Sequence, residues 1–363
     1  MTRRNNTRRS PSVRYAISPA IETPVSGAGA TVSAAGPVHL LDAISASRVD
    51  ESKFRFDLLT REWVAITRAR QKRPNLPSDN CPFCVGGLEA PTPYVVKAFP
   101  NRWPALVPGE PVDSRLSLRE PALGVPGRGA AEIVLYSPDH NASLASLGPE
   151  HVRRGIDLWV ERTEQLLSRP EIEYVLVFEN RGAEVGATIS HPHGQIYAFP
   201  FIPPVAAREA AVADEFGCPL CVEVNTGLRD GARLVTVNDS FLAFTRFAAG
   251  WPFELLIAPR DHLQDLSVLD EQERFDLANI LGETLARYDR LFDMPLPYML
   301  WLHPGVHLHF HVVTTRRQAK TMRFIAAGEL GSGVMFNPVL PEEAALQLRR
   351  AGYGYRPGVE SER

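Results

Sequence analysis

A pattern of cysteines and histidines occurs twice along this chain of 363 residues. The first copy comprises Cys81-Pro-Phe-Cys84, Asp139-His140 and His191-Pro-His193-Gly-Gln195, and the second comprises Cys218-Pro-Leu-Cys221, Asp261-His262 and His307-Leu-His309-Phe-His311. From the second cysteine to the first histidine the separations are 56 and 41 residues, and from that histidine to the next they are 51 and 45. The pattern uses all four cysteines and most of the ten histidines. It therefore predicts a duplicated unit with two cysteine and two histidine metal ligands in each half.

Length and charge restrict the class of protein. A chain of this length can form two domains or two fused halves with a substantial core. The net charge of −3 excludes a strongly basic nucleic-acid-binding protein, and no apolar run approaches the length of a membrane span. We therefore expect neither nucleic acid nor a membrane as a partner. Two Cys-x-x-Cys pairs suit metal binding in a reducing compartment better than a disulfide framework, which predicts a cytoplasmic protein.

The N-terminal segment resembles a secretory signal only in part. Its first 14 residues carry five arginines and no acidic residue, and a stretch rich in proline, serine, glycine and alanine follows to about Gly36. Glu22 and two prolines interrupt this stretch, so the continuous apolar core of a signal is missing. We expect residues 1–50 to form a disordered tail and residues 356–363 to form a second tail.

The order of predicted elements is similar in the two halves. Residues 54–66 have the pattern of a β-hairpin. Strands are expected at 131–136, 174–179, 189–199, 241–247, 253–258, 298–302 and 308–313, and helices at 149–168, 270–291 and 341–351. This order predicts an α+β fold with halves at 51–204 and 205–355, joined near residues 204–217, and an antiparallel sheet flanked by helices in each.

The first copy of the pattern has the residues for group transfer. Because a strand places residues i, i+2 and i+4 on one face, His191, His193 and Gln195 should point into one site. His191 can complete a closed zinc site with Cys81, Cys84 and His140. His193 can then act as a nucleophile toward phosphorus, with the Gln195 amide donating a hydrogen bond to a phosphate oxygen.

Simpler explanations exist for each part of this pattern. A single Cys-x-x-Cys is often a redox pair or buried, and a single His-x-His on a strand is more often structural than catalytic. The repeated spacing favours zinc over the first explanation. The glycine-bearing segment Glu179-Asn180-x-Gly182-x-x-x-Gly186 before the histidines favours catalysis over the second.

The motifs resemble those of a known family. Phe178-Glu-Asn-Arg-Gly, His191-Pro-His-Gly-Gln-Ile and Ser137-Pro-Asp-His140 are similar to those of the galactose-1-phosphate uridylyltransferases, in the histidine-triad superfamily, and the resemblance covers residues 54–352. It implies two tandem histidine-triad-like halves and a homodimer with shared sites. It also implies a ping-pong reaction: His193 takes UMP from UDP-glucose, glucose 1-phosphate leaves, and galactose 1-phosphate takes the UMP.

The resemblance also implies residues that contact the substrates. These are Arg70, Arg73, Asn101, Asn180, Gly186, Thr188, Arg323, Phe324 and Glu329. The two N-terminal arginines would reach substrate phosphates, and the alternative explanation is a solvated basic turn. Small residues between Asn180 and Thr188 would let the backbone approach phosphates. The last three residues would hold the hexose.

Two ligand sets compete for a second metal. Symmetry with the first half predicts Cys218, Cys221, His262 and His307 as zinc ligands. The family resemblance implies instead Glu209, His303, His307 and His309, with iron as an alternative metal. Both sets use His307, so we expect only one to be filled, and we favour the set with cysteines. His311 stands where Gln195 stands in the first half, which argues against catalysis in the second half.

Some positions depart from the uridylyltransferase pattern. Arg102, Gly328 and Met335 replace residues expected near the nucleotide and the hexose, and the segments 101–106 and 329–338 look more like the branch that includes plant ADP-glucose phosphorylase. The alternative function is therefore a sugar-nucleotide phosphorylase or adenylyltransferase that uses the same His193. A second alternative is a non-catalytic, zinc-stabilised nucleotide-binding protein. A zinc-containing nucleic-acid module is disfavoured, because no basic stripe with interleaved aromatics is present.

Overall fold

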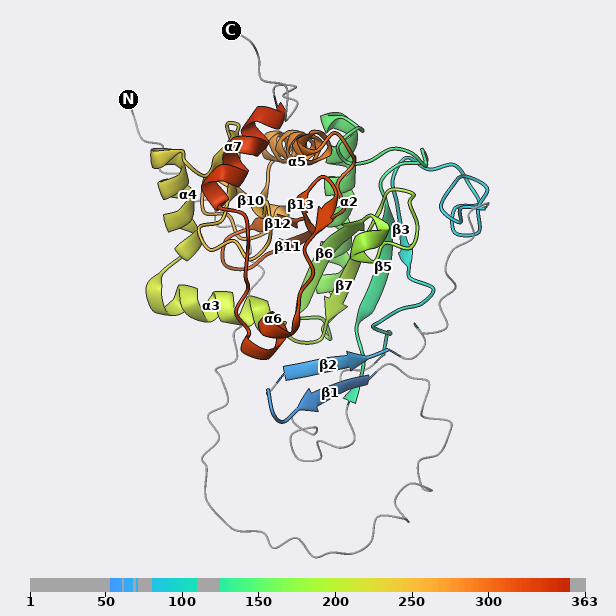
Figure 1. Ribbon diagram of the computed structural model, residues 1–363. Helices are drawn as coiled ribbons and strands as arrows, with labels where there is room; N and C mark the ends of the chain where they lie inside the picture. Colours follow the sequence, from blue (N-terminus) through green and yellow to red (C-terminus); the bar gives the residue numbers. More distant parts are fainter. Residues whose placement is uncertain (1–52, 61, 68–69, 71–79, 110–124, 353–363) are drawn as a thin grey trace, which may run out of the picture.

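The computed structural model describes residues 53–60, 62–67, 70, 80–109 and 125–352 (Figure 1). The two predicted tails and Arg73 lie outside these ranges.

One antiparallel sheet runs through the described part of the chain. Its nine strands stand in the order β3 (Lys97–Pro100), β5 (Ala130–Leu135), β7 (His193–Phe199), β6 (Tyr174–Arg181), β11 (Tyr298–His303), β12 (His309–Val313), β10 (Leu255–Pro259), β9 (Phe241–Thr245) and β8 (Leu234–Val237). The predicted α+β class and antiparallel pairing are confirmed. The sheets of the two halves are not separate, however, because β6 pairs with β11, from Tyr298 opposite Arg181 to Trp301 opposite Phe178. This pairing satisfies two strand edges that would otherwise be open.

Three helices cover one face of this sheet: α2 (Pro149–Leu167), α5 (Glu271–Leu291) and α7 (Pro341–Gly352) (Figure 1). The main core lies between them and the sheet, where Val177, Leu300 and Phe310 are buried in one cluster with Trp159 and Leu285 of the helices. Asp270 and Glu273 form a capping box that starts α5. These helices match the predicted ranges within a few residues.

The opposite face carries the polar residues of the strands. Because side chains alternate along a strand, burying Ile196, Leu302 and Phe310 under the helices turns Gln195 and His309 to the other face. Two helices that the sequence analysis did not predict, α3 (Pro204–Phe216) and α4 (Pro219–Asp230), form the connection between the halves. Each begins with proline in its first turn, which suits a helix start.

The remaining elements are short. The predicted hairpin is present as β1 (Lys53–Asp57) and β2 (Glu62–Ile66), and it forms a three-stranded sheet with β4 (Val125–Pro126). A two-stranded ribbon of β13 (Arg316–Gln318) and β14 (Thr321–Met322) leads to α6 (Ala327–Ser332). None of the helices in the described ranges has the length and apolarity that a membrane crossing requires.

Candidate active site and metal clusters

Cys81, Cys84, His140 and His191 form a first cluster. Their ligand atoms all lie within 4.8 Å of one another, and Cys84 Sγ is 3.5 Å from His140 Nδ1 and 3.6 Å from His191 Nδ1. The cysteines occupy a tight turn, in which a Cβ at Gly87 would lie 2.6–2.8 Å from the backbone oxygens of Cys81, Pro82 and Cys84. Glycine at this position therefore allows the turn to close around the thiols.

The two histidines of the first cluster are oriented by their other ring nitrogens. His191 Nε2 lies 2.7 Å from the backbone oxygen of Ser137, and His140 Nε2 lies 3.0 Å from Ser190 Oγ. A proton on Nε2 of His191 leaves its Nδ1 lone pair facing the thiols, as in metal-ligating histidines. Burial lowers the pKa of His191, which keeps the ring neutral. Burial and the neighbouring Cys81 raise the pKa of Cys84, so two thiolates here need a cation. The donor set fits a divalent metal.

Cys218, Cys221, His262 and His307 form a second cluster with the same construction. Cys221 Sγ lies 3.3 Å from His262 Nδ1 and 3.4 Å from His307 Nδ1. His307 Nε2 lies 3.2 Å from the backbone oxygen of Pro259, at the end of β10, as His191 contacts Ser137 just after β5. The pKa of Cys221 is raised to about 11, mainly by burial and to a smaller extent by the neighbouring Cys218. The second half thus repeats the arrangement of two cysteines and two histidines found in the first.

Glu209, His303, His309 and His311 form a third cluster. Glu209 Oε1, on α3, lies 3.0 Å from His303 Nδ1 and 3.8 Å from His309 Nε2. Burial, with a contribution from His311, lowers the pKa of His309 to about 3, so its ring is neutral and able to bind a metal. A pocket of about 150 Å³ opens over this cluster and is lined in part by Arg246 and Glu223.

The expectation that the two sets for a second metal share His307 is wrong for this geometry. His307 precedes β12 and turns Nδ1 toward the cysteines, whereas His309 and His311 project from β12 on one face. His311 therefore takes the place that we expected for His307 in the set with Glu209. The second and third clusters have no residue in common, so both can be filled together.

His193 and Gln195 lie side by side on the polar face of β7. His193 Nδ1 is 2.8 Å from the backbone oxygen of His191, and its side chain is buried. A proton on Nδ1 places the lone pair on Nε2, the atom that would attack an electrophile. Gln195 Oε1 is buried without a hydrogen-bond partner among the described residues. His309 Nδ1 contacts the His307 oxygen at 2.7 Å, so the second half repeats the imidazole but not the glutamine.

Gly194 stands between these residues because the opposite face has no room for a side chain. A Cβ there would lie 2.0 Å from Tyr136 Oη and 3.0 Å from the backbone oxygen of Phe178. Because Gly194 has no side chain, β7 packs directly against the buried Tyr136. This contact fixes the position of the strand and therefore of His193 and Gln195.

The predicted N-terminal substrate residues that the structure describes lie on different segments of the chain. Extending the β6–β7 register from Phe178 opposite Gln195 brings Asn180 opposite His193. Gly186, at φ 85°, and the exposed Thr188 lie in the loop that enters the motif. Arg70 Nη1 donates to Tyr197 Oη at 3.1 Å, two residues beyond Gln195 on the same face. Asn101 follows the edge strand β3, where its Oδ1 accepts a hydrogen bond from the Trp103 N–H.

Two of the three predicted hexose residues form a cluster of their own in the second half. Arg323 and Glu329 are both buried and form an ion pair, and the Arg323 guanidinium lies 4.6 Å from the ring centre of Trp251. Phe324 does not join them, because its side chain points outward and is 72% exposed. Sequence reasoning missed Trp251 and Glu254, which support this cluster. The only signal for them was their place at or just before the strand expected at 253–258, which pairs with the strand that carries His309 and His311.

Comparisons with known proteins agree with this geometry. Residues 43–203 match the N-terminal domain, and residues 212–352 the C-terminal domain, of the family described as galactose-1-phosphate uridyl transferase. The galactose-1-phosphate uridylyltransferase of Thermotoga maritima is 36% identical over 82% of this chain and 98% of its own. A solved uridylyltransferase structure is 28% identical with a TM-score of 0.73, covering 83% of this chain and 98% of that one.

A second solved structure represents the other branch. The ADP-glucose phosphorylase of Arabidopsis thaliana, with bound ADP-glucose, is 27% identical with a TM-score of 0.62, and the match covers 82% of this chain and 98% of that one. The family models together span most of the chain, and the Thermotoga protein is similar along almost its entire length. The chain therefore belongs to the galactose-1-phosphate uridylyltransferase family.

Proposed function

We propose that this protein is a nucleotidylyltransferase that moves UMP from UDP-glucose to galactose 1-phosphate. The observation that carries this proposal is the position of His193, whose Nδ1 is bound to the backbone oxygen of His191 at 2.8 Å beside Gln195. His191 belongs in turn to the first cluster. A group held in this way presents Nε2 in one direction, so little entropy is lost when it attacks.

The reaction follows from these groups. In the first step, His193 Nε2 attacks the α-phosphorus of UDP-glucose, a P–N bond forms, and the P–O bond to glucose 1-phosphate breaks. The Gln195 amide donates to a phosphate oxygen where charge develops. In the second step, a phosphate oxygen of galactose 1-phosphate attacks the same phosphorus and the P–N bond breaks. Because the acceptor is already an anion, this step needs no strong general base.

Zinc is the metal we propose for the first and second clusters. Two thiolates and two neutral imidazoles make a tetrahedral set that zinc prefers, and a closed set of this kind is structural. When bound, zinc would supply cross-links between distant loops, and in the first cluster it would fix His191 and thereby the carbonyl that orients His193. For the third cluster, three imidazoles and one carboxylate suit zinc or iron.

A homodimer in the cytoplasm is also part of this proposal. The segment around α6 exposes large apolar side chains, with Leu330 78%, Phe324 72% and Phe336 63% exposed. Such a patch is costly in water unless a partner covers it, and a second copy is the partner that the family resemblance implies. Cysteine pairs used as metal ligands suit a reducing cytoplasm.

Intact-mass analysis tests the catalytic part of the proposal. The protein is incubated separately with UDP-glucose and with ADP-glucose, with His193→Ala as the matched variant. A UMP adduct that is absent in the variant and disappears on addition of galactose 1-phosphate is the expected result. If neither donor gives an adduct, the proposal is refuted, and the remaining alternative is a non-catalytic nucleotide-binding protein stabilised by metal.

A sugar-nucleotide phosphorylase is the second candidate. It is favoured by the similarity to the plant enzyme with bound ADP-glucose and by the segment that begins at Asn101-Arg102. In this case the same experiment should give an AMP adduct that phosphate removes.

A further inference from the structure

Glu254 is a buried carboxylate that lies between the third cluster and the predicted hexose residues. Its side chain is 4% exposed and lies immediately before β10, on the face that carries His311. Neither the two-step reaction nor the metal sets account for a buried charge at this position. A buried charge is costly unless its hydrogen bonds are satisfied, so its partners indicate its role.

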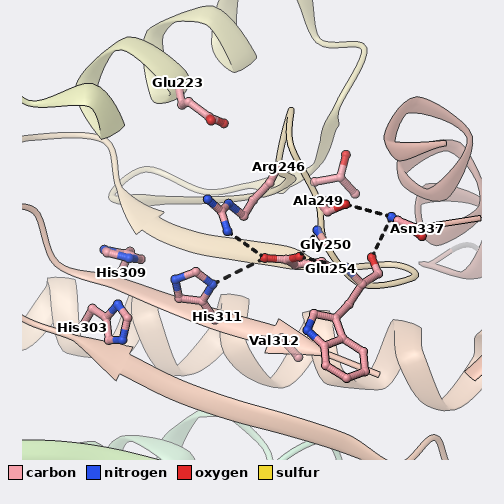
Figure 2. A network of polar contacts seen from close by, with 12 residues as sticks. Glu223, Arg246, Ala249, Gly250, Glu254, His303, His309, His311, Val312 and Asn337 are labelled. Carbon is pink, nitrogen blue, oxygen red and sulfur yellow. Dashed lines mark hydrogen bonds and ion pairs between the residues drawn. The ribbon is translucent and has the colours of Figure 1, made fainter. Parts of the chain in front are cut away.

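The two oxygens of Glu254 have different partners (Figure 2). Oε1 accepts a hydrogen bond from Arg246 Nη1 at 3.1 Å and lies 3.7 Å from His311 Nδ1. Oε2 accepts hydrogen bonds from the backbone N–H groups of Gly250 at 2.7 Å and Trp251 at 3.1 Å. One oxygen therefore faces the third cluster, and the other closes the turn at residues 249–251.

The same turn is bound from its other side by Asn337. Asn337 Nδ2 donates to the backbone oxygens of Ala249 at 3.1 Å and Trp251 at 3.0 Å. Glu254 therefore binds the N–H groups of the turn, and Asn337 binds the carbonyl groups of the same turn. Asn337 lies at the end of residues 323–337, the hexose segment, which contains the predicted hexose residues. Figure 2 shows Asn337 and Glu254 on opposite sides of the Ala249–Gly250 backbone.

The near end of the hexose segment rests on the same turn. The Arg323 guanidinium packs on the Trp251 ring, 4.6 Å from its centre, and its Nε donates to the backbone oxygen of Phe336 at 3.4 Å. Arg323 also pairs with Glu329, which accepts the Ala326 N–H at 2.7 Å. Both ends of residues 323–337 thus meet one three-residue turn, and much of the segment between them is exposed.

We propose that Glu254 is a positioning residue that holds residues 323–337, and with them the sugar end of the substrate, through the turn at 249–251. The proposal rests on the function proposed above for Arg323 and Glu329. Glu254 touches neither reactant, and it acts by fixing the turn on which both ends of this segment are supported. It also fixes the segment relative to His311, and so to the strand that carries the third cluster.

Hydrogen exchange of the full-length protein tests the anchor independently of activity. Glu254→Ala should increase exchange in residues 249–251 and 323–337 by about tenfold or more, because two hydrogen bonds to a buried charged acceptor are lost. Glu254→Gln retains a carbonyl oxygen for these N–H groups and should restore most of the protection. Glu132→Ala is the matched control, since Glu132 is also a buried carboxylate, paired with Arg162 at 2.6 Å under the helices.

Kinetics test the link to the sugar. Glu254→Ala should increase the KM for galactose 1-phosphate by about 10- to 100-fold, the scale expected for misplacing a binding segment by an ångström, while the affinity for UDP stays unchanged. Asn337→Asp removes both amide donors and should give a similar increase, and the double variant should be less than additive because both residues hold one turn.

Three results would overturn the inference. The first is protection of residues 323–337 that is unchanged in Glu254→Ala, and the second is an equal loss of protection in Glu132→Ala. Equal weakening of UDP and galactose 1-phosphate binding would also overturn it, since that pattern indicates general destabilisation. Failure of the wild-type protein to form any nucleotidyl adduct would instead refute the proposed function, and the exchange comparison would still decide the anchor.

Discussion

Replacing Gly194 by alanine tests whether the catalytic strand is positioned by contact with Tyr136. The added Cβ would lie 2.0 Å from Tyr136 Oη and 2.9 Å from Tyr136 Cζ, and the ring cannot easily move because it is buried and packs edge-on against Trp159 at 5.8 Å. Overpacking of this kind costs about 1–3 kcal/mol of the free energy of unfolding. The alternative is a shift of β7 by about 1 Å, which would displace His193 and slow adduct formation by about 100-fold.

Two measurements decide this prediction. Guanidinium unfolding gives the loss of stability, and intact-mass time courses with UDP-glucose give the rate of adduct formation. Tyr136→Phe in the Gly194→Ala background removes the nearest oxygen and should recover part of both losses. Gly227→Ala is the control, because nothing lies within 4 Å of a Cβ there. Wild-type stability together with a wild-type rate in Gly194→Ala would show that the contact does not position the strand.

Three further perturbations address the metals, the pH dependence and the assembly. Gly87→Ala should release the zinc proposed for the first cluster, measured as metal content after desalting, because its Cβ would lie 2.6 Å from the Cys81 oxygen. An unchanged zinc content would contradict the argument that the tight turn is needed for binding. Burial lowers the pKa of His309 from 6.5 to about 3, so in metal-free protein the unfolded chain binds more protons than the folded chain between these values. The free energy of unfolding should therefore fall as the pH drops through this window, by up to about 1.4 kcal/mol per unit, and His309→Asn should flatten the slope. Leu330→Asp, at a side chain 78% exposed, should shift the proposed homodimer to monomer in light scattering, whereas an unchanged dimer mass would contradict the proposal that this patch is the dimer contact.

Local sequence signals predicted the elements well where hydrophobic periodicity was strong. Residues 270–291 were expected to be helical, and α5 occupies Glu271–Leu291. Residues 204–217 were expected to be a connection, yet α3 occupies Pro204–Phe216 and carries Glu209 into the third cluster. Pro203 and Pro204, at the start of this helix, obscured it, although proline is well tolerated in a first turn.

The three clusters show what the spacing of cysteines and histidines along the sequence can and cannot predict. The duplicated pattern pointed to two sets of two cysteines and two histidines, and the structure brings the members of each set within ligand distance. Spacing could not separate His307 from His311, because residues i and i+4 on a strand share a face. Only the position of His307 just before β12, with Nε2 held by the Pro259 carbonyl, turns it toward the cysteines.

The sequence by itself determined the duplication, the α+β class, the ligand types and the histidine beside Gln195, because each depends on residue identity and on spacing along one strand. The tertiary structure decided that one sheet joins the halves, that His311 rather than His307 lies with Glu209, and that Glu254 and Asn337 hold the same turn. These contacts join residues as far apart as Glu209 and His303 or Ala249 and Asn337. Whether such residues meet depends on how the strands pair and pack, which periodicity along the chain does not encode.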